Sequence, residues 1–350
     1  MELRFYTPEM DFIGVMENQS YVNWSRRYFE PGTVSIIAPI TNDNVIMTAK
    51  GNLVWIRGAA EAAVIEDRTI EEGYRTNRIT AQGRFLSSYM DRRLIRPRVN
   101  FSGRVEVAMR QLLSGAEPLP RVELGTLVGF TDTISFQASY KNLLTYEQKL
   151  AQTANFGFRF RPDFTEKKIE FEVYKGKDRT LSQAENSRVI FSEQYDNLDK
   201  VRMRETNQIK KTCVYIGGQI DESTGTRKVV SFGTELTGLE RRELFVDARD
   251  MAPDDLTEAE YEAKLLQRGH EKQLEYAESM AFECETDPAS NFIYKQDYDL
   301  GDLVSVRKKR WNITVDLRIT GIDEVYEKGG TRIVPVFGNP LASAIDWSDD

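Results

Sequence analysis

The pattern of apolar and polar positions in the first ninety residues is that of short β-strands. Apolar runs occupy residues 34–37, 53–56, 62–65 and 78–81, and Gly, Pro or Asn residues separate them. Runs of this length that are bounded by turn residues are typical of antiparallel strands, which close into a barrel or pack as a sandwich. We therefore expect a first β domain over residues 1–98.

From residue 99 the pattern changes to mixed helices and strands. Apolar residues at steps of three and four predict two helices, one that opens at residues 102–103 and one at residues 141–153. The pattern then alternates strictly, with Phe156, Phe158 and Phe160 on one side of a strand. A second alternating run follows within ten residues, so we expect an α+β module with a one-faced sheet over residues 99–185.

Strand patterns resume after a turn-rich connection, and the longest helix pattern of the chain, residues 255–278, interrupts them. Residues 313–320 alternate strongly, and a Lys-Gly-Gly turn leads into a returning strand. We expect a second β domain that is split by a helical insertion. Its segments are residues 186–245 and 279–340, with the insertion at 246–278 and a tail at 341–350. The fold class is therefore α+β and mainly β.

Charge is segregated along the chain. Residues 71–110 hold nine arginines and four acidic residues, whereas residues 254–285 hold ten acidic residues and three basic ones. Two solvated faces would explain this distribution. The sharper interpretation is that the two faces meet across a domain or subunit interface, where complementary charge sets the register. The candidate interface residues are Arg92, Arg93, Arg96 and Arg98 on one side and Glu258 and Glu262 on the other.

The densest basic run comprises Arg307, Lys308, Lys309 and Arg310, followed by Trp311. It could contact phosphate, with the tryptophan stacking on a base. Because it lies between two predicted strands, we interpret it as a hairpin tip and include its four basic residues among the candidate interface residues.

Composition excludes several kinds of chemistry. The chain has 350 residues but only one His and two Cys, too few for zinc sites, Cys/His nucleophile pairs or a disulfide framework. The formal charge of −8 argues against a dedicated nucleic-acid binder. We expect neither a secretion signal nor a membrane span, because no apolar run has the required length.

The individual candidates for chemistry have structural explanations. We interpret His270 as a helix residue and Cys213 and Cys284 as strand residues of a core. Asp297, Asp299 and Asp302 resemble a loop for a hard cation, but the segment leads directly into a strand, which favours a turn. No glycine-rich nucleotide cradle follows a strand. We therefore assign no catalytic, cofactor-binding or metal-binding residue, and expect no enzymatic activity.

Several segments together resemble the tail-associated hub proteins of siphophages and related prophages of Gram-positive bacteria. They occur in that family's order over nearly the whole chain, and none is a catalytic signature. The segments are Trp24-Ser-Arg-Arg-Tyr-Phe-Glu-Pro-Gly, Gly83-Arg-Phe-Leu with Asp91-Arg-Arg, Ser139-Tyr-Lys-Asn-Leu-Leu, Phe171-Glu-Val-Tyr-Lys-Gly-Lys-Asp-Arg, Arg241-Arg-Glu-Leu-Phe-Val-Asp-Ala-Arg, Asp297-Tyr-Asp-Leu-Gly-Asp-Leu-Val and Pro335-Val-Phe-Gly-Asn-Pro.

The resemblance implies a hub similar to those of contractile-tail baseplates and type VI secretion spikes. Such a subunit has two antiparallel β-barrel domains with an inserted α+β module and a helical excursion. Three subunits form a homotrimer whose six barrels make a pseudo-sixfold ring. The ring docks below the hexameric distal tail protein and closes the tail tube.

The same resemblance implies the partners and the location. The expected partners are the chain itself, the distal tail protein, the tape measure protein, receptor-binding or fibre proteins, and DNA in transit through the channel. The expected location is the tip of a virion tail assembled in the host cytoplasm. Because a channel for DNA should bind it weakly, we expect more acidic than basic residues on its lumen side.

Two other functions stay open. The chain could be a module that recognises a cell-surface sugar or protein, with Trp24, Trp55, Trp311 and Trp347 as stacking surfaces. It could also be a wall hydrolase that uses carboxylates. Family members with lytic activity carry long C-terminal extensions, whereas only ten residues follow Pro340 here. We expect any lytic activity to come from another protein.

Overall fold

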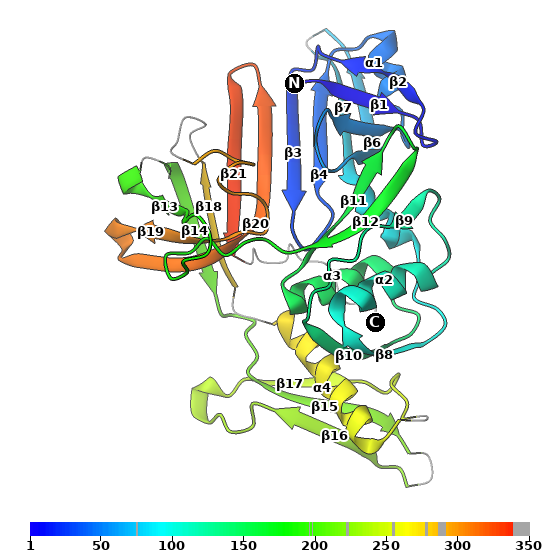
Figure 1. The fold of residues 1–350 in the computed structure, drawn as a ribbon, viewed down its shortest axis with the longest axis vertical. Coiled ribbons are helices and arrows are strands. Elements are labelled where there is room, and N and C mark those ends of the chain that lie inside the picture. The colour runs from blue at the N-terminus through cyan, green and yellow to red at the C-terminus, as the bar shows by residue number, and fades with distance from the viewer. Residues whose placement is uncertain are drawn as a thin grey trace.

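The computed structural model describes residues 1–74, 76–195, 197, 199–221, 224–253, 256–276, 279–285 and 292–338. Its fold is α+β and mainly β, as the sequence predicts. Three regions stand apart in Figure 1: tall strands at one end, helices in the middle and a small sheet under one helix at the other end.

The N-terminal part is an antiparallel sheet in the order β3-β4-β7-β6-β5-β1-β2. Its core forms because alternate residues of each strand, such as Val22 and Trp24 of β3, point to one face, where they are buried with Phe5, Ile36 and Phe85. The elements are β1 (Leu3–Tyr6), β2 (Phe12–Met16), β3 (Tyr21–Arg27), β4 (Thr33–Ala38), α1 (Asn42–Met47), β5 (Leu53–Ile56), β6 (Ala63–Glu72) and β7 (Asn77–Phe85).

The C-terminal strands continue this same sheet. Strand β20 (Ile313–Glu327) pairs with β3 from Gly321 opposite Arg27 to Glu327 opposite Tyr21. The N-terminal and C-terminal strands therefore belong to one sheet, which Figure 1 shows as tall neighbouring strands. The other elements of this part are β13 (Ile190–Ser192), η2 (Glu193–Tyr195), β14 (Asp199–Thr206), β18 (Ser279–Glu285), β19 (Leu303–Lys308), η4 (Lys309–Trp311) and β21 (Gly330–Gly338).

The middle of the molecule combines short helices with small sheets. Phe156, Phe158 and Phe160 are buried together, which confirms the predicted alternation. The first helix begins at Val105 and not at residues 102–103, because residues 99–104 pair as a strand with β10. The elements are η1 (Leu86–Arg92), β8 (Val99–Arg104), α2 (Val105–Gly115), β9 (Val122–Leu124), β10 (Thr133–Ala138), α3 (Leu143–Ala154), β11 (Gly157–Asp163) and β12 (Lys168–Tyr174).

A separate sheet lies at the far end of the molecule (Figure 1). Strands β15 (Cys213–Ile220), β16 (Arg227–Phe232) and β17 (Glu243–Asp247) pair with one another, and α4 (Glu258–Leu274) packs on them. The short helix η3 (Gly238–Glu240) precedes β17. We expected these strands in the second β domain and only residues 246–278 in the insertion, whereas their apolar residues pack on α4.

Candidate assembly surfaces and the buried arginine junction

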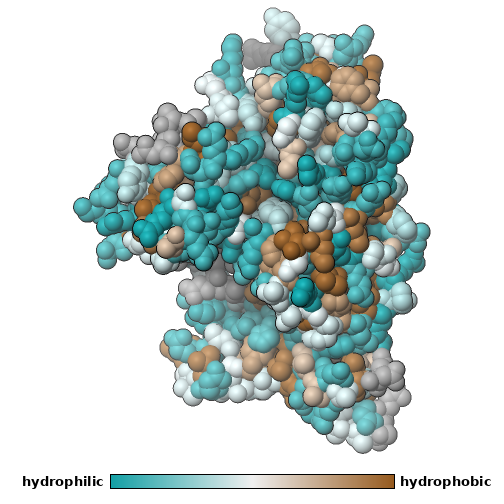
Figure 2. Space-filling model, in the orientation of Figure 1, coloured by the Kyte–Doolittle hydropathy of each residue, from teal (hydrophilic) through white to brown (hydrophobic). Residues whose placement is uncertain are grey.

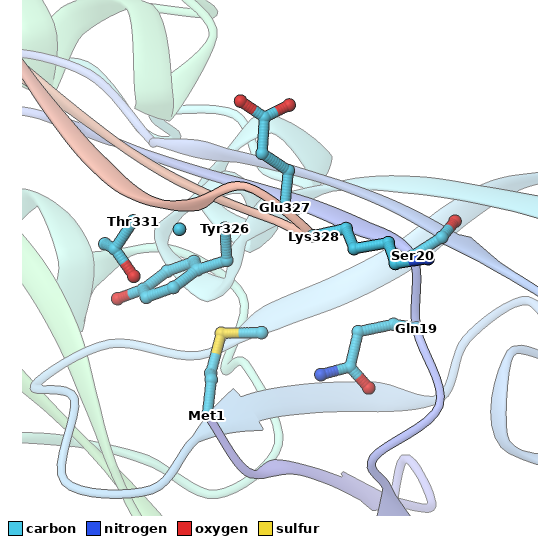
Figure 3. A pocket seen from close by; sticks show the side chains of 8 residues that line it. Met1, Gln19, Ser20, Tyr326, Glu327, Lys328 and Thr331 are labelled. Carbon is cyan, nitrogen blue, oxygen red and sulfur yellow. The ribbon is translucent and has the colours of Figure 1, made fainter.

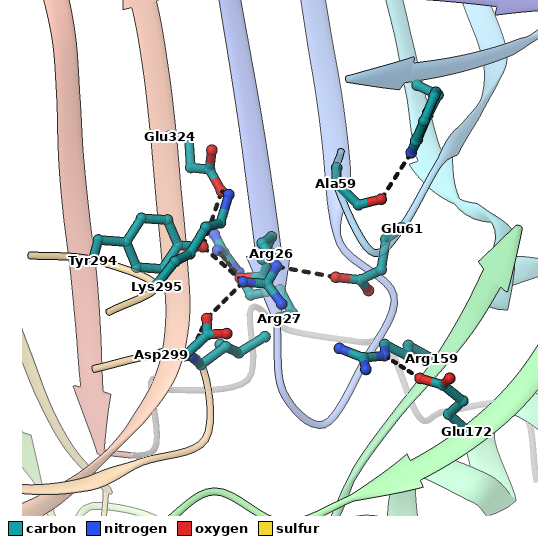
Figure 4. Close-up of polar contacts among 12 residues, drawn as sticks. Arg26, Arg27, Ala59, Glu61, Arg159, Glu172, Tyr294, Lys295, Asp299 and Glu324 are labelled. Carbon is teal, nitrogen blue, oxygen red and sulfur yellow. Dashed lines mark hydrogen bonds and ion pairs between the residues drawn. The ribbon is translucent and has the colours of Figure 1, made fainter. Parts of the chain in front are cut away.

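A buried arginine joins the first β-strands to the C-terminal part. Arg26 follows Val22 and Trp24 on the core face of β3, so its guanidinium enters the interior. Nε donates to Glu61 at 3.1 Å, and Nη1 donates to Asp299 and to the hydroxyl of Tyr294, both at 2.7 Å. Figure 4 shows these groups converging from three segments that are distant in the sequence.

A second buried carboxylate completes the junction. Glu324 of β20 accepts hydrogen bonds from Tyr294 at 2.9 Å and from Lys295 at 3.0 Å. Burial raises the pKa of the Tyr294 hydroxyl well above its ordinary value, so this group stays a donor. The junction anchors the segment 292–302 to both β3 and β20, and so adds to the direct pairing of these two strands.

The acidic segment that resembled a cation loop is a turn, as predicted. Asp302 accepts from the backbone N–H of Lys177 and from Nε of Arg179, each at 2.7 Å, and Asp299 pairs with Arg26. Among the described residues, no group of three or more His, Cys, Asp or Glu is arranged to hold a metal ion.

The single histidine and one of the cysteines lie in packed surroundings. His270 stacks on Phe232 with ring centroids 4.1 Å apart, and burial lowers its pKa. Cys213 is a buried free thiol in β15. The side chain of Cys284 lies outside the described residues.

The four candidate arginines differ in the contacts that their side chains make within the chain. Arg92 lies over the ring of Tyr89 at 4.5 Å, and Arg93 donates to the carbonyl oxygens of Glu117 and Pro118. Arg96 is 58% exposed and 3.6 Å from the exposed Glu117. Arg98 is also exposed. Arg96 and Arg98 therefore have charges that a partner can reach.

The candidate acids lie at the start of α4. Glu258, 79% exposed, accepts from Lys228 at 2.7 Å, and Glu262 pairs with the same lysine. The hydrogen bond from Lys228 lowers the pKa of Glu258. Arg96 pairs with Glu117, whereas Glu258 and Glu262 pair with Lys228, so these ion pairs do not bring the two sets together within one chain.

The basic run is a hairpin tip, as predicted. Arg307 and Lys308 end β19, Lys309 and Arg310 lie in η4, and β20 begins at Ile313. Lys308 pairs with Glu193 and lies over the ring of Trp311 at 5.4 Å. Arg307, Lys309 and Arg310 are exposed.

The three tryptophans that the structure describes do not form a stacking surface together. Trp24 is buried in the first core, and Trp55 donates to the carbonyl oxygen of Ala59 at 2.8 Å while packing against the α+β core. Trp311 is at the hairpin tip, and Trp347 lies outside the described residues.

One open pocket of about 370 Å³ lies beside the β20–β21 turn. Figure 3 shows Gln19, Tyr326 and Thr331 around it, with Met1 below. The complete lining is Met1, Gln19, Ser20, Tyr326, Glu327, Lys328, Gly330 and Thr331. Among these described residues no hydroxyl or thiol nucleophile stands beside a histidine base.

An exposed apolar loop follows β9. Leu124, Leu127 and Val128 are exposed, and the buried carboxylate of Glu106 fixes the loop by accepting from the N–H groups of Val128 and Gly129 at 2.7 Å. On the face drawn in Figure 2, hydrophobic residues gather over the middle of the molecule, where α2 and α3 lie in Figure 1. Exposed apolar surface of this kind is typical of sites where a protein contacts another protein chain.

The residues that sequence reasoning missed are those of the junction. Arg26 lies in the segment that begins Trp24-Ser-Arg-Arg, but no motif joins it to Glu61 and Glu324, which come from separate regions of the chain. The one available signal was the position of Arg26, two residues after Trp24 and therefore on the same strand face.

Of the helices that the structure describes, none combines the length and the apolar character that a membrane crossing requires.

Comparison with known proteins gives one family match. The model of the family described as Siphovirus ReqiPepy6 Gp37-like protein matches residues 2–339. No curated protein matches the chain.

Three solved structures share the fold over nearly the full length of both chains. The 43 kDa tail protein of prophage MuSo2 from Shewanella oneidensis has 13% identity and a TM-score of 0.58, covering 96% of this chain and 98% of that one. Prophage tail protein gp18 from Listeria monocytogenes EGD-e has 12% identity and a TM-score of 0.56, covering 98% and 96%. The tail protein from Neisseria meningitidis MC58 has 12% identity and a TM-score of 0.57, covering 97% and 96%.

Proposed function

The chain belongs to the Siphovirus ReqiPepy6 Gp37-like protein family, and we propose that it is the structural hub at the tip of a siphophage or prophage tail. The observation that carries the proposal is the family match over residues 2–339, which leaves almost none of the chain outside it. The fold shared with three tail proteins supports the same function.

We propose that three copies form a ring. In this arrangement the two β parts of each subunit are barrels, so the ring has six barrels and pseudo-sixfold symmetry. It docks below the hexameric distal tail protein and closes the tail tube. The pairing of β3 with β20 supports such a role, because one continuous sheet makes the two β parts of a subunit a single rigid wall.

The centre of the ring is a channel for the tape measure protein and for DNA. One face of the tall sheet suits a channel wall: Asn23 lies opposite Ser35, and Gln82 lies beside Ser35 on β7, all on the side away from the core. These three uncharged polar groups neutralise no phosphate, so this part of the face contributes little affinity for DNA. We further propose that acidic side chains outnumber basic ones on the lumen side.

The contacts between subunits include the segregated charges. Arg92, Arg93, Arg96 and Arg98 of one subunit meet Glu258 and Glu262 of the next, and the tip residues Arg307, Lys308, Lys309 and Arg310 contribute to a second contact. The exposure of Arg96 and Glu258 supports this assignment.

Charge reversal tests this interface. We expect R96E and E258R each to weaken trimer formation about tenfold at low salt, because like charges at an interface repel, and the double variant to recover part of the loss. Analytical ultracentrifugation measures the effect. The control is R57E, an exposed arginine paired with Glu2. Unchanged assembly of both single variants would remove these residues from the interface.

The ring acts in the virion at the tail tip, after assembly in the host cytoplasm, and it contacts receptor-binding or fibre proteins. It carries no catalytic activity of its own. Two assays separate this function from the alternatives: mixing the protein with a distal tail protein detects docking, and zymography on cell walls detects hydrolysis. Clear lysis by the purified protein would contradict a purely structural role.

A further inference from the structure

The tall sheet in Figure 1 has an open strand edge on each side. Beyond Val64, β6 pairs only with β7 among the described residues, so the outer edge of residues 67–72 has no strand partner. On the opposite side, the described part of β18 pairs with β21 only from Val336 to Gly338, which leaves the outer edge of residues 330–335 open. Open strand edges are templates for pairing with another chain.

The two open edges are the ends of one row of side chains. Residues that lie opposite each other on neighbouring strands share a face of the sheet. The registers of five strand pairs place six residues in this row, all on the side away from the core. They are Arg332 of β21, Val325 of β20, Asn23 of β3, Ser35 of β4, Gln82 of β7 and Asp67 of β6. The row therefore begins with a cation at one edge and ends with an anion at the other.

The charges at the two edges are accessible and complementary. The side chain of Arg332 is 43% exposed and lies 3.2 Å from Glu327, and Asp67 is exposed. Nearer the tips of the two hairpins, Lys328 lies in the β20–β21 turn and Glu72 ends β6, and both are exposed. Each edge thus presents charges that the opposite edge of a second copy would attract.

The directions of the two edge strands also match. Five successive antiparallel pairings separate β21 from β6, so these strands run in opposite directions. Rotation of a second copy about an axis parallel to the strands would place its β21 antiparallel beside β6 of the first copy. The alternation of strand directions then continues from copy to copy, and the row continues with Asp67 opposite Arg332 of the second copy.

We propose that copies of this chain join edge to edge, with β6 of one copy paired with β21 of the next and Asp67 opposite Arg332. Because the two edges differ, the contact is head-to-tail, and contacts of this kind close into a ring when the rotation permits. The proposal rests on the trimeric hub for the number of copies. It adds a specific strand pair to the contacts between subunits of that hub.

Disulfide cross-linking of the full-length protein tests this strand pair. The variant D67C/R332C carries the two new cysteines, and C213A with C284A removes both native thiols. Opposite residues of an antiparallel pair have Cα atoms about 4.5–5.5 Å apart, which a disulfide can span. After oxidation with diamide, we expect denaturing gels to show linked dimers and a linked product of three chains.

Single-cysteine variants and a displaced pair provide the controls. D67C alone and R332C alone should stay monomeric on the gel, because a head-to-tail contact does not place a residue beside its own copy. In D11C/R332C, the first cysteine replaces Asp11, which is 59% exposed and lies outside the β6 edge. This pair should cross-link at least tenfold less.

A charge exchange gives a second readout that needs no cysteine. D67R places two cations together and should weaken assembly about tenfold at low salt, whereas D67R/R332D should recover most of the loss. Since Asp67 is exposed and Arg332 half-exposed, these variants should melt near the wild-type temperature.

The outcomes separate this contact from the hub itself. Trimers in analytical ultracentrifugation that D67C/R332C does not link would overturn the strand pair and leave the trimeric hub standing. Equal cross-linking by D11C/R332C would also overturn it, because random collision would then explain the products. A protein that stays monomeric and unlinked would overturn both the strand pair and the trimer.

Discussion

At the scale of single residues, buried charge decides how the two β parts are held. Charged side chains usually lie at the surface, yet the alternation of β3 places Arg26 in the interior with Glu61. Desolvation makes such a pair costly to form, and removing one partner is more costly because the other charge stays buried. The sequence could not predict this pair, because its members are separated by 35 positions and share no motif.

Arg26 tests the junction. R26M keeps most of the volume but leaves Glu61 and Asp299 without their cation, so we expect a loss of about 3–5 kcal/mol in the free energy of unfolding. Urea unfolding measures it. The exposed pair of Arg57 and Glu2 provides the control, since R57M should cost less than about 1 kcal/mol. Equal effects of the two variants would show that the junction contributes no special stability.

Glu147 of α3 is fully buried, and neither carboxylate oxygen has a hydrogen-bond partner among the described residues. Burial raises its pKa well above 4.5. Because the folded state then holds a proton that the unfolded state releases, the stability that this group contributes is present at low pH and falls as pH rises above about 4.5 toward the folded-state pKa.

E147L should remove this contribution to the pH dependence. We expect the variant to be more stable than the wild type, by an amount that grows between about pH 5 and pH 8. Thermal unfolding across this range measures the difference. E117L, at an exposed position, should leave the slope unchanged. A difference between E147L and wild type that does not vary with pH would contradict the assignment.

At the scale of elements, strict alternation was the most reliable signal. It predicted the strands around Phe158 and the hairpin of β20 and β21, because one face of each is buried. The alternation of apolar and polar residues was weaker at β8, where only alternate positions are partly buried. The sequence therefore predicted that the next helix, α2, begins earlier than Val105. It could not show which strands pair, and so did not reveal that β15 and β17 belong with α4.

The start of α4 offers a test of this separate unit. Thr257 and Glu260 form a capping box, in which each side chain bonds to the backbone of the other residue. T257A should destabilise the unit by about 1 kcal/mol. T237A is the matched control, because Thr237 precedes η3 without a side-chain capping bond. Hydrogen exchange of α4 measures the change, and equal protection in both variants would contradict a capping role.

At the scale of the whole molecule, family membership was predictable because the matching segments span the chain in order. The meeting of the charged faces between subunits stays a prediction, since within the chain Arg96 and Glu258 pair locally with Glu117 and Lys228. One chain satisfies its own charges in part and still exposes them, together with the apolar loop after β9. A hub assembled from several copies would use such surfaces.

Electron cryo-microscopy of the purified protein tests the central claim most directly. If the protein is a trimeric hub, the particles should contain three chains, about three times 40.2 kDa, and have threefold symmetry. They should also have a central channel whose wall carries more acidic than basic side chains. A stable monomer, a particle without threefold symmetry or a strongly basic channel would contradict the account.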